Sequence, residues 1–247
     1  MTWIAPILLW APTLFDQSVA KVLHRNFPEA QYILVATGTN TVLDSRWIGS
    51  DLPSSMGSLV KPFTALAAEH KPARCNPAQC WLGGAGHGLI DLQQAIAHSC
   101  NSYFLQVSAS VHPGRLQTVA QRYGLPMPDS LSPAVLTGIG REWKISPVVL
   151  AEAYSKLAFT SEAEALREGM RASAREGTAK AIRLPALAKT GTAPCSHAKR
   201  APVDGYVAVL YPADAPKYML LVQVHGVSGA VAATTAGRML TVLRDGE

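Results

Sequence analysis

Residues 54–63 read SSMGSLVKPF and place Ser58 three positions before Lys61 in an otherwise apolar run. In a helix, side chains three residues apart lie on one face, one turn apart. Gly57 permits a tight turn into such a helix, and Pro62 is best tolerated in its first turn. Burial lowers the pKa of a lysine, and an uncharged amine beside a hydroxyl can take its proton. This stretch therefore predicts a nucleophile with its base.

The spacing S-x-x-K is weak evidence alone, because it also occurs at Ser18–Lys21 and at Ser196–Lys199. The first of these pairs lies on the polar face of a predicted helix and the second in a loop rich in Cys, His and Arg. We expect both to be solvated surface. Ser58–Lys61 is preferred, although Pro62 disfavours helical geometry at the residue before it.

Two further polar motifs follow. Ser99 and Asn101 form an S-x-N, which by itself is more often a helix cap or a turn than a site. The chain has a single K-T-G, which begins at Lys189 in a β-prone run. On a strand, Lys189 and Gly191 face one way and the threonines on either side of Gly191 face the other. A glycine within a strand often marks where a ligand comes close to the backbone.

Strand-like segments at both ends of the chain enclose a helical middle. Residues 30–47 predict a β-hairpin with a GTN turn, and further strands are expected over 186–193, 203–212 and 217–226. Helices are expected over 16–26, 58–70, from an N-cap at Asp91 onward, 114–123, 147–158 and 230–245, with a loop over 71–90. This layout predicts an α+β fold, an antiparallel sheet flanked by helices with an inserted all-helical subdomain. The sheet layer is expected from about 16–57 and 180–247, and the helical part from about 58–179.

The composition is that of a folded globular protein, since 48% of the 247 residues are hydrophobic and only 16% are charged. The net charge of +5 includes no basic block and aromatics are few, so nucleic-acid binding is not expected. A carboxylate-bearing substrate fits the sign of the charge.

Residues 1–15 are apolar over about half the length of a membrane span and lack a basic start. A remnant or atypical form of an export signal and a packed first segment are both open.

The cysteines leave three alternatives open. Cys75 and Cys80, in CNPAQC, could form a disulfide in an oxidising compartment, or stay free thiols. With His70 and His87 nearby a zinc site is conceivable, although the spacing matches no strong template. We expect no metal in the active site and no cofactor.

The order and spacing of the motifs carry the functional interpretation. Ser99 follows Ser58 by 41 residues, and Lys189 follows Ser99 by 90. S-x-x-K, S-x-N and K-T-G in this order resemble the transpeptidase domain of penicillin-binding proteins, in the superfamily of serine β-lactamases and DD-transpeptidases. The resemblance covers roughly residues 16–245 and includes the stretches 86–104, 138–158, 167–194 and 203–224.

The resemblance implies a catalytic mechanism. Ser58 would attack the carbonyl of a D-Ala-D-Ala peptide stem, or of a β-lactam that mimics it, and form an acyl-enzyme. Lys61 would be the base that activates Ser58. Ser99 would relay a proton to the leaving nitrogen, with Lys189 supporting that step electrostatically.

It also implies the substrate contacts. Asn101 would hold the amide of the substrate. The hydroxyls of Thr190 and Thr192, on either side of Gly191, would bind its terminal carboxylate. Backbone N–H groups of Ser58 and Thr192 would form the oxyanion hole. Peptidoglycan lies outside the cytoplasmic membrane, so the cell envelope, or the periplasm of a Gram-negative cell, is the expected location. A membrane-anchored cell-wall partner protein is a further expectation.

The alternatives concern the fate of the acyl-enzyme. Class A β-lactamases use an additional glutamate to activate water, and Glu162, Glu164 and Glu168 lie here in an exposed helical pattern. This favours a transpeptidase or carboxypeptidase. A β-lactamase or β-lactam sensor of the class D type is an alternative, although those pair S-x-x-K with S-x-V and Tyr-Gly-Asn, whereas Tyr123-Gly124 precedes leucine. A catalytically inactive module of the same fold is the third.

Overall fold

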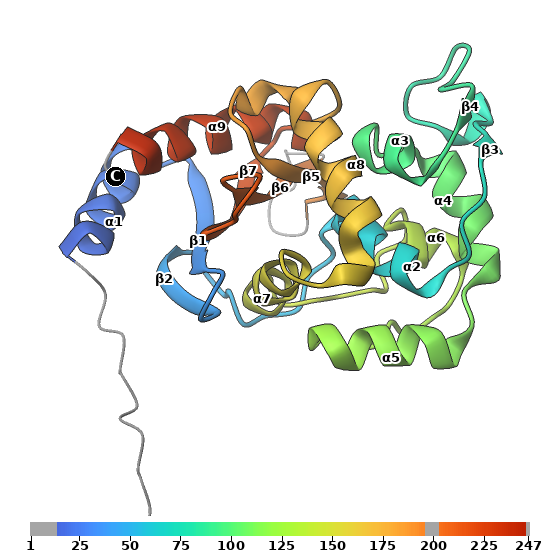
Figure 1. Ribbon diagram of the computed structural model, residues 1–247, viewed down its shortest axis with the longest axis horizontal. Helices are drawn as coiled ribbons and strands as arrows, with labels where there is room; N and C mark the ends of the chain where they lie inside the picture. Colours follow the sequence, from blue (N-terminus) through green and yellow to red (C-terminus); the bar gives the residue numbers. More distant parts are fainter. Residues whose placement is uncertain (1–13, 196–202, 246–247) are drawn as a thin grey trace, which may run out of the picture.

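The computed structural model describes residues 14–195 and 203–245. Its main sheet is antiparallel with the strand order β2-β1-β7-β6-β5 (Figure 1). The strands are β1 (Ala30–Ala36), β2 (Thr41–Arg46), β5 (Leu187–Pro194), β6 (Val203–Tyr211) and β7 (Tyr218–His225). Two strands from the N-terminal part therefore join three from the C-terminal part, which confirms the predicted antiparallel α+β fold.

The central strands are apolar on both faces, which requires cover on both sides of the sheet. In β1, Tyr32 and Leu34 belong to one core and Ile33 and Val35 to the other. The 30–47 hairpin forms as predicted, with β1 paired to β2 and an irregularity in register between Leu34 and Val35. Strand β5 is an edge strand, so one side of its backbone faces the helical part instead of another strand.

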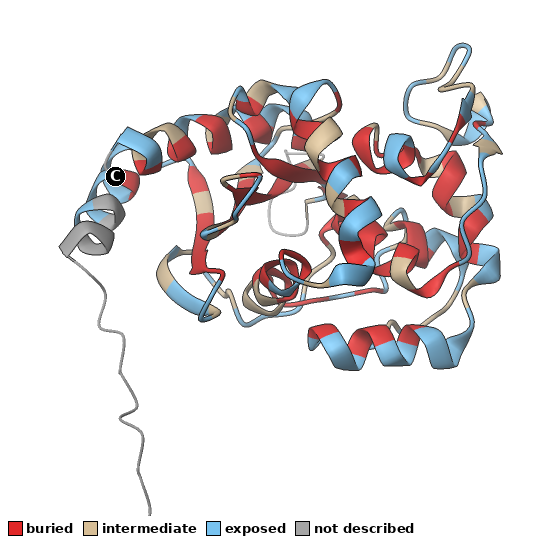
Figure 2. Cartoon of the chain, viewed as in Figure 1, coloured by how far each residue is buried: buried red, intermediate tan, exposed pale blue. Residues whose placement is uncertain are grey.

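The helices divide between the two faces (Figure 1). Helices α1 (Leu14–Asn26) and α9 (Gly229–Asp245) pack together and close the core on one face. The other face is covered by the helical part, whose members are the 3-10 turn η1 (Gly57–Val60), α2 (Lys61–Ala67), α3 (Leu92–Ala97), α4 (Asn101–Val107), α5 (Pro113–Tyr123), α6 (Pro133–Thr137), α7 (Pro147–Leu157) and α8 (Glu164–Arg175). Figure 2 shows α5 with its buried side toward this core and its outer side exposed.

Four details differ from the sequence-based expectation. The helix expected over 58–70 ends at Ala67, and the one expected from Asp91 onward is broken after Ala97. The stretch 71–90 contains a small hairpin of β3 (Ala73–Arg74) and β4 (Leu89–Ile90) within the part expected to be all helical. Helix α6 was not expected, because five residues are too few for a periodic pattern.

Some sequence-based predictions concern residues that lie outside the described part of the chain. The pair Ser196–Lys199 and nearly all of the segment 1–15 lie there. Ser18 and Lys21 lie in α1 and are exposed, as expected for solvated surface. In the part of the chain that is described, no helix combines the length and apolarity needed to cross a bilayer.

Candidate active site

Close backbone packing holds the start of α2 against strand β5. Gly57 has φ +57°, and a Cβ there would lie 2.2 Å from the carbonyl oxygen of Thr192. A Cβ on Gly191 would lie 2.5 Å from the carbonyl oxygen of Met56. Only glycine allows these approaches, so the two glycines bring Ser58 next to the K-T-G strand. The group that approaches Gly191 closely is thus the main chain at Met56, whereas the sequence suggested a ligand at this position.

Lys61 keeps helical geometry although proline follows it. Its φ of −53° and ψ of −41° are those of a right-handed helix. Pro62 lies in the first turn of α2, where its missing N–H has no partner to lose. The preference against helical geometry before proline is therefore overridden by tertiary packing, and Lys61 is completely buried.

The break between α3 and α4 shapes the second motif. Asp91 caps α3 in a capping box with Gln94, and the helix ends at Ala97. Ser99 then has φ +52°, a left-handed conformation that costs a non-glycine residue about 1–3 kcal/mol. With this backbone, the carbonyl oxygen and the hydroxyl of Ser99 both face Lys61.

Two buried amines meet at Ser99. Lys61 Nζ donates to the carbonyl oxygen of Ser99 at 2.8 Å, to Asn101 Oδ1 at 2.6 Å and to Ser99 Oγ at 3.3 Å. Lys189 Nζ donates to Ser99 Oγ at 2.7 Å and to the carbonyl oxygen of Thr190 at 2.7 Å. The Ser99 hydroxyl therefore bridges both amines.

Burial sets the charge state of these amines. Burial lowers the pKa of Lys61 from its usual range to about 7. The pKa of Lys189 is lowered well below its usual range, first by burial and then by repulsion from Lys61. Within the described residues no carboxylate forms an ion pair with either amine. Lys61 can thus be uncharged near neutral pH, as a base must be.

One expected contact is different. Among the described residues the Ser58 hydroxyl makes no hydrogen bond, and Lys61 directs its amine to Ser99 and Asn101 instead. The reason is that the left-handed Ser99 offers two acceptors to a buried donor, while half-buried Ser58 faces the cavity. Catalytic hydrogen bonds that are long or absent without substrate often form only when it binds.

The third motif is fixed from both sides. Thr190 Oγ1 donates to Thr178 Oγ1 at 2.7 Å, and Thr192 Oγ1 accepts from the Gly229 N–H at 3.0 Å. Gly177 packs closely against the end of α3, since a Cβ on it would lie 2.2 Å from the carbonyl oxygen of Ala97. Only glycine fits there, and this close approach brings the next residue, Thr178, to Thr190. The two threonine hydroxyls of β5 are therefore held at defined positions.

These groups surround a cavity of about 450 Å³. Six of the eight predicted site residues line it: Ser58, Ser99, Asn101, Thr190, Gly191 and Thr192. The remaining two, Lys61 and Lys189, lie beneath it and contact Ser99. The structure thus brings all eight together from segments far apart in the chain.

Sequence reasoning missed the walls of this cavity. They are Trp81, Gly138, Ile139, Thr178, Pro194, Ser228 and Ala230. Thr178 stands in a Gly-Thr-Ala that resembles the family, which was a usable signal. Trp81 lies in a loop without periodicity, and its place in the wall depends on a hydrogen bond from its Nε1 to the carbonyl oxygen of His98, at 2.9 Å.

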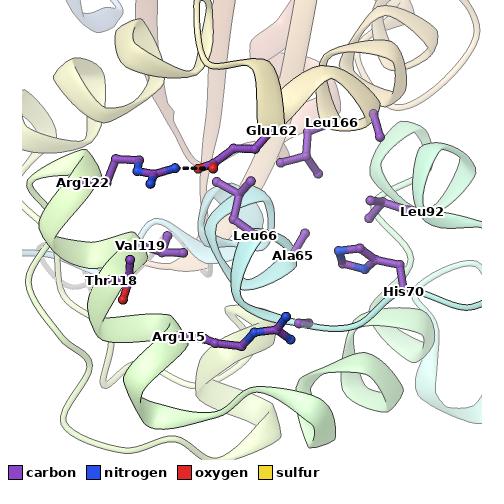
Figure 3. Close-up of a pocket in the computed structure, with 12 residues that line it drawn as sticks. Ala65, Leu66, His70, Leu92, Arg115, Thr118, Val119, Arg122, Glu162 and Leu166 are labelled. Carbon is purple, nitrogen blue, oxygen red and sulfur yellow. Dashed lines mark hydrogen bonds and ion pairs between the residues drawn. The ribbon is translucent and has the colours of Figure 1, made fainter.

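A second cavity, of about 430 Å³, lies between α2, α5 and α8 (Figure 3). Glu162 and Arg122 form an ion pair at its edge, and His70 lies on its other side. Among the residues that the structure describes, its lining contains no serine, cysteine or lysine. Glu162 therefore belongs to a different part of the molecule from Ser58.

Comparison with known proteins agrees with this geometry. A sequence model described as the penicillin binding protein transpeptidase domain matches residues 50–241, which include all three motifs. The chain therefore belongs to the family of penicillin-binding protein transpeptidase domains. A search of curated proteins finds no match.

Solved structures of low sequence identity share the fold. The transpeptidase domain of the FtsI4 D,D-transpeptidase from Legionella pneumophila superposes with a TM-score of 0.70 at 19% identity, covering 94% of this chain and 95% of that one. PBP2 from Helicobacter pylori, solved in complex with MreC, gives 0.75 at 16% identity over 93% of this chain and 62% of its own. PBPA from Mycobacterium tuberculosis gives 0.72 at 16% identity, covering 94% and 82%.

Proposed function

We propose that this protein is a penicillin-binding serine acyltransferase, a DD-transpeptidase or DD-carboxypeptidase, that acts on D-Ala-D-Ala stems through an acyl-enzyme at Ser58. The observation that carries the proposal is the Ser99 hydroxyl shared by two buried amines, beside a serine that faces the cavity. Membership of the family supports the reaction class.

The proposed reaction begins with attack of Ser58 Oγ on the carbonyl of the penultimate D-Ala. Uncharged Lys61 takes the serine proton, and a C–O bond forms as the C–N bond to the last D-Ala breaks. Ser99, held by Lys189, passes a proton to the leaving amine. The N–H groups of Ser58 and Thr192 stabilise the oxyanion, a contribution of about 3–4 kcal/mol for each donor.

The substrate would lie along β5. An edge strand has free main-chain groups that an extended peptide can pair with. Thr190 and Thr192, on either side of Gly191, would bind the terminal carboxylate, and Asn101 would hold the amide of the stem. Trp81, which is 56% exposed, offers an apolar wall to the rest of the stem.

The fate of the acyl-enzyme depends on a base for water. The described residues that line the cavity include no aspartate or glutamate, so no carboxylate stands ready to activate a water molecule there. Tyr123 is buried against Phe63 and does not line the cavity, unlike what a class D-like site would need. A slowly hydrolysed acyl-enzyme that is passed to an amine acceptor is therefore favoured over a β-lactamase.

Location and partners follow from the substrate. Cross-linked peptidoglycan lies outside the cytoplasmic membrane, so we place the active protein in the cell envelope. A membrane-anchored cell-wall protein is the kind of partner we infer for this chain. The similar PBP2 of Helicobacter pylori, which was solved in complex with MreC, supports a protein partner.

Release of D-alanine from a synthetic stem peptide ending in D-Ala-D-Ala tests the proposal. The wild-type chain should release D-alanine, with cross-linked product when an amine acceptor is added. Ser58→Ala should abolish release, whereas Ser18→Ala, a matched change on the exposed face of α1, should not. A fluorescent penicillin should give a stable adduct. Rapid loss of that adduct would indicate a β-lactamase, and no adduct an inactive module.

A further inference from the structure

Three cysteines and a histidine lie together beside the candidate active site. The first and last of them are 25 residues apart in the sequence. They are Cys75, Cys80, His87 and Cys100, and their ligand atoms all lie within 4.8 Å of one another. Cys75, Cys80 and Cys100 are free thiols, so the disulfide considered from the sequence does not form. His70, the other histidine considered there, lies in the second cavity instead (Figure 3).

The separations match tetrahedral coordination. The sulfur of Cys80 lies 3.2 Å from His87 Nδ1 and 3.9 Å from Cys100 Sγ. The sulfur of Cys75 lies 3.6 Å from His87 Nδ1 and 3.5 Å from Cys100 Sγ. With Zn–S of ~2.3 Å and Zn–N of ~2.0–2.1 Å, a tetrahedral zinc site sets its donor atoms roughly 3.5–3.8 Å apart.

The surrounding backbone is built around these sulfur atoms. Gly86 has φ +64°, and a Cβ there would lie 3.0 Å from Cys75 Sγ, so the loop closes on the sulfur. The N–H of Tyr103 donates to Cys100 Sγ at 3.5 Å, a bond that favours a thiolate. The short β3–β4 hairpin holds both ends of the loop, and the Asn76 N–H donates to Ser102 Oγ at 2.8 Å.

We infer that Cys75, Cys80, Cys100 and His87 bind one zinc ion as a closed structural site. Three thiolates and an imidazole in a tetrahedral set are the donors that zinc prefers, and four protein ligands leave no position open for chemistry. On binding, the three thiols release their protons to solvent. The neutral imidazole would bind through Nδ1, since that atom faces the sulfurs.

The ion would connect the 75–88 loop to the catalytic centre. Cys100 is the middle residue of the S-x-N motif, between Ser99 and Asn101, and Cys80 precedes Trp81 in the cavity wall. Zinc would therefore hold the strained turn at Ser99 and the Trp81 wall in one arrangement. The inference stands without the proposed function, because metal content is measured without any substrate.

Metal analysis of the purified 247-residue chain is the first test. We expect about one zinc per wild-type chain. Cys80→Ser and His87→Ala should weaken zinc binding by more than the roughly 10–100-fold that loss of an outer-shell partner costs. The matched controls His70→Ala and Cys195→Ser should keep the metal. Zinc lost only in Cys195→Ser would assign it to the group Cys195, Asp204 and His225 and overturn the inference.

A second test needs no variant that might misfold. Zinc is removed from the wild-type chain with a chelator and Co²⁺ is added. The inference predicts intense visible bands of tetrahedral cobalt with sulfur-to-metal charge transfer, and a thermal-unfolding midpoint that rises when zinc is returned. Weak octahedral bands, an unchanged midpoint, or a disulfide among the three cysteines of the native chain would overturn it.

Discussion

Ser99 shows how much chemistry one residue can organise. Its left-handed backbone turns a carbonyl oxygen and a hydroxyl toward the same buried amine, and its hydroxyl also accepts from Lys189. Strained residues persist where surrounding contacts over-determine them, and they are common at functional sites. Here the strained turn lets two lysines contact one hydroxyl, which we propose is the proton relay.

Removing the Ser99 hydroxyl should therefore slow acylation strongly. For Ser99→Ala we expect the rate of labelling by a fluorescent penicillin to fall by about 10²–10⁴-fold, the usual contribution of a positioned proton-transfer group. Stopped-flow or timed-quench labelling measures it. A rate within a few-fold of wild type would show that the hydroxyl is not part of the proton path.

The pH dependence follows from Lys61, whose pKa burial lowers to about 7. Below that pH the amine is protonated and cannot accept the Ser58 proton, so acylation should rise about tenfold per pH unit and level off above it. Measuring the acylation rate of the wild-type chain from pH ~5.5 to ~9 tests this sign. Unfolding midpoints over the same range serve as the control. A rate that is flat or falls through pH 7 would contradict a neutral Lys61.

At the scale of elements, glycines decide how closely the segments around the candidate active site approach one another. Gly57, Gly138 and Gly229 each lie where a Cβ would be 2.2 Å from a backbone oxygen of a neighbouring segment. Through Gly57 and Gly229, η1 and the start of α9 pack directly against β5. Through Gly138, the turn after α6 packs against η1. Backbone-to-backbone packing of these segments thus fixes the positions from which the side chains of the candidate site extend.

Gly57→Ala tests this junction. The added methyl group conflicts with the Thr192 carbonyl and with φ +57°, so we expect a loss of about 1–3 kcal/mol of unfolding free energy together with loss of penicillin labelling. Gly38 has no neighbour within 4 Å of its added Cβ. Gly38→Ala, measured by the same denaturant titration, should change stability by less than about 0.5 kcal/mol. Equal effects of the two changes would contradict the packing account.

Elements with a clear period were predictable, and elements defined by tertiary contacts were not. The 30–47 hairpin and the strands at 187–194 and 203–211 carry their own turn residues and apolar runs. No glycine or proline marks the break at His98–Cys100, which depends on the lysines that Ser99 contacts. The strands β3 and β4, of two residues each, are too short to leave a pattern.

At the scale of the whole molecule, the sheet separates two cores. One lies under α1 and α9, and the other joins the sheet to the helical part that carries Ser58 and Ser99. The candidate active site lies where the edge strand β5 meets the helical part. The core under α9 supports it by holding the sheet and the start of α9, where the Gly229 N–H donates to Thr192 Oγ1. Sequence order could identify the three motifs, but the walls of the cavity follow from this packing and could not be predicted.

A substitution at Leu240 in α9 tests whether the stability of the fold and the acylation rate are independent. It is completely buried in the remote core, so Leu240→Ala should lower the free energy of unfolding by about 2–5 kcal/mol. The acylation rate of the remaining folded molecules should not change. Val231 on the same helix is 53% exposed, and Val231→Ala should affect neither quantity. An acylation rate that falls with Leu240→Ala would show that the two cores are coupled through the sheet.

The proposed reaction requires that Ser58 is the residue that becomes acylated. Mass spectrometry of the wild-type chain after brief exposure to a penicillin, followed by proteolysis, measures this most directly. We expect a single penicilloyl group, located on Ser58 in the peptide that contains SSMGSLVKPF, residues 54–63. A penicilloyl group on any other residue, or a chain that carries none after exposure, would contradict it.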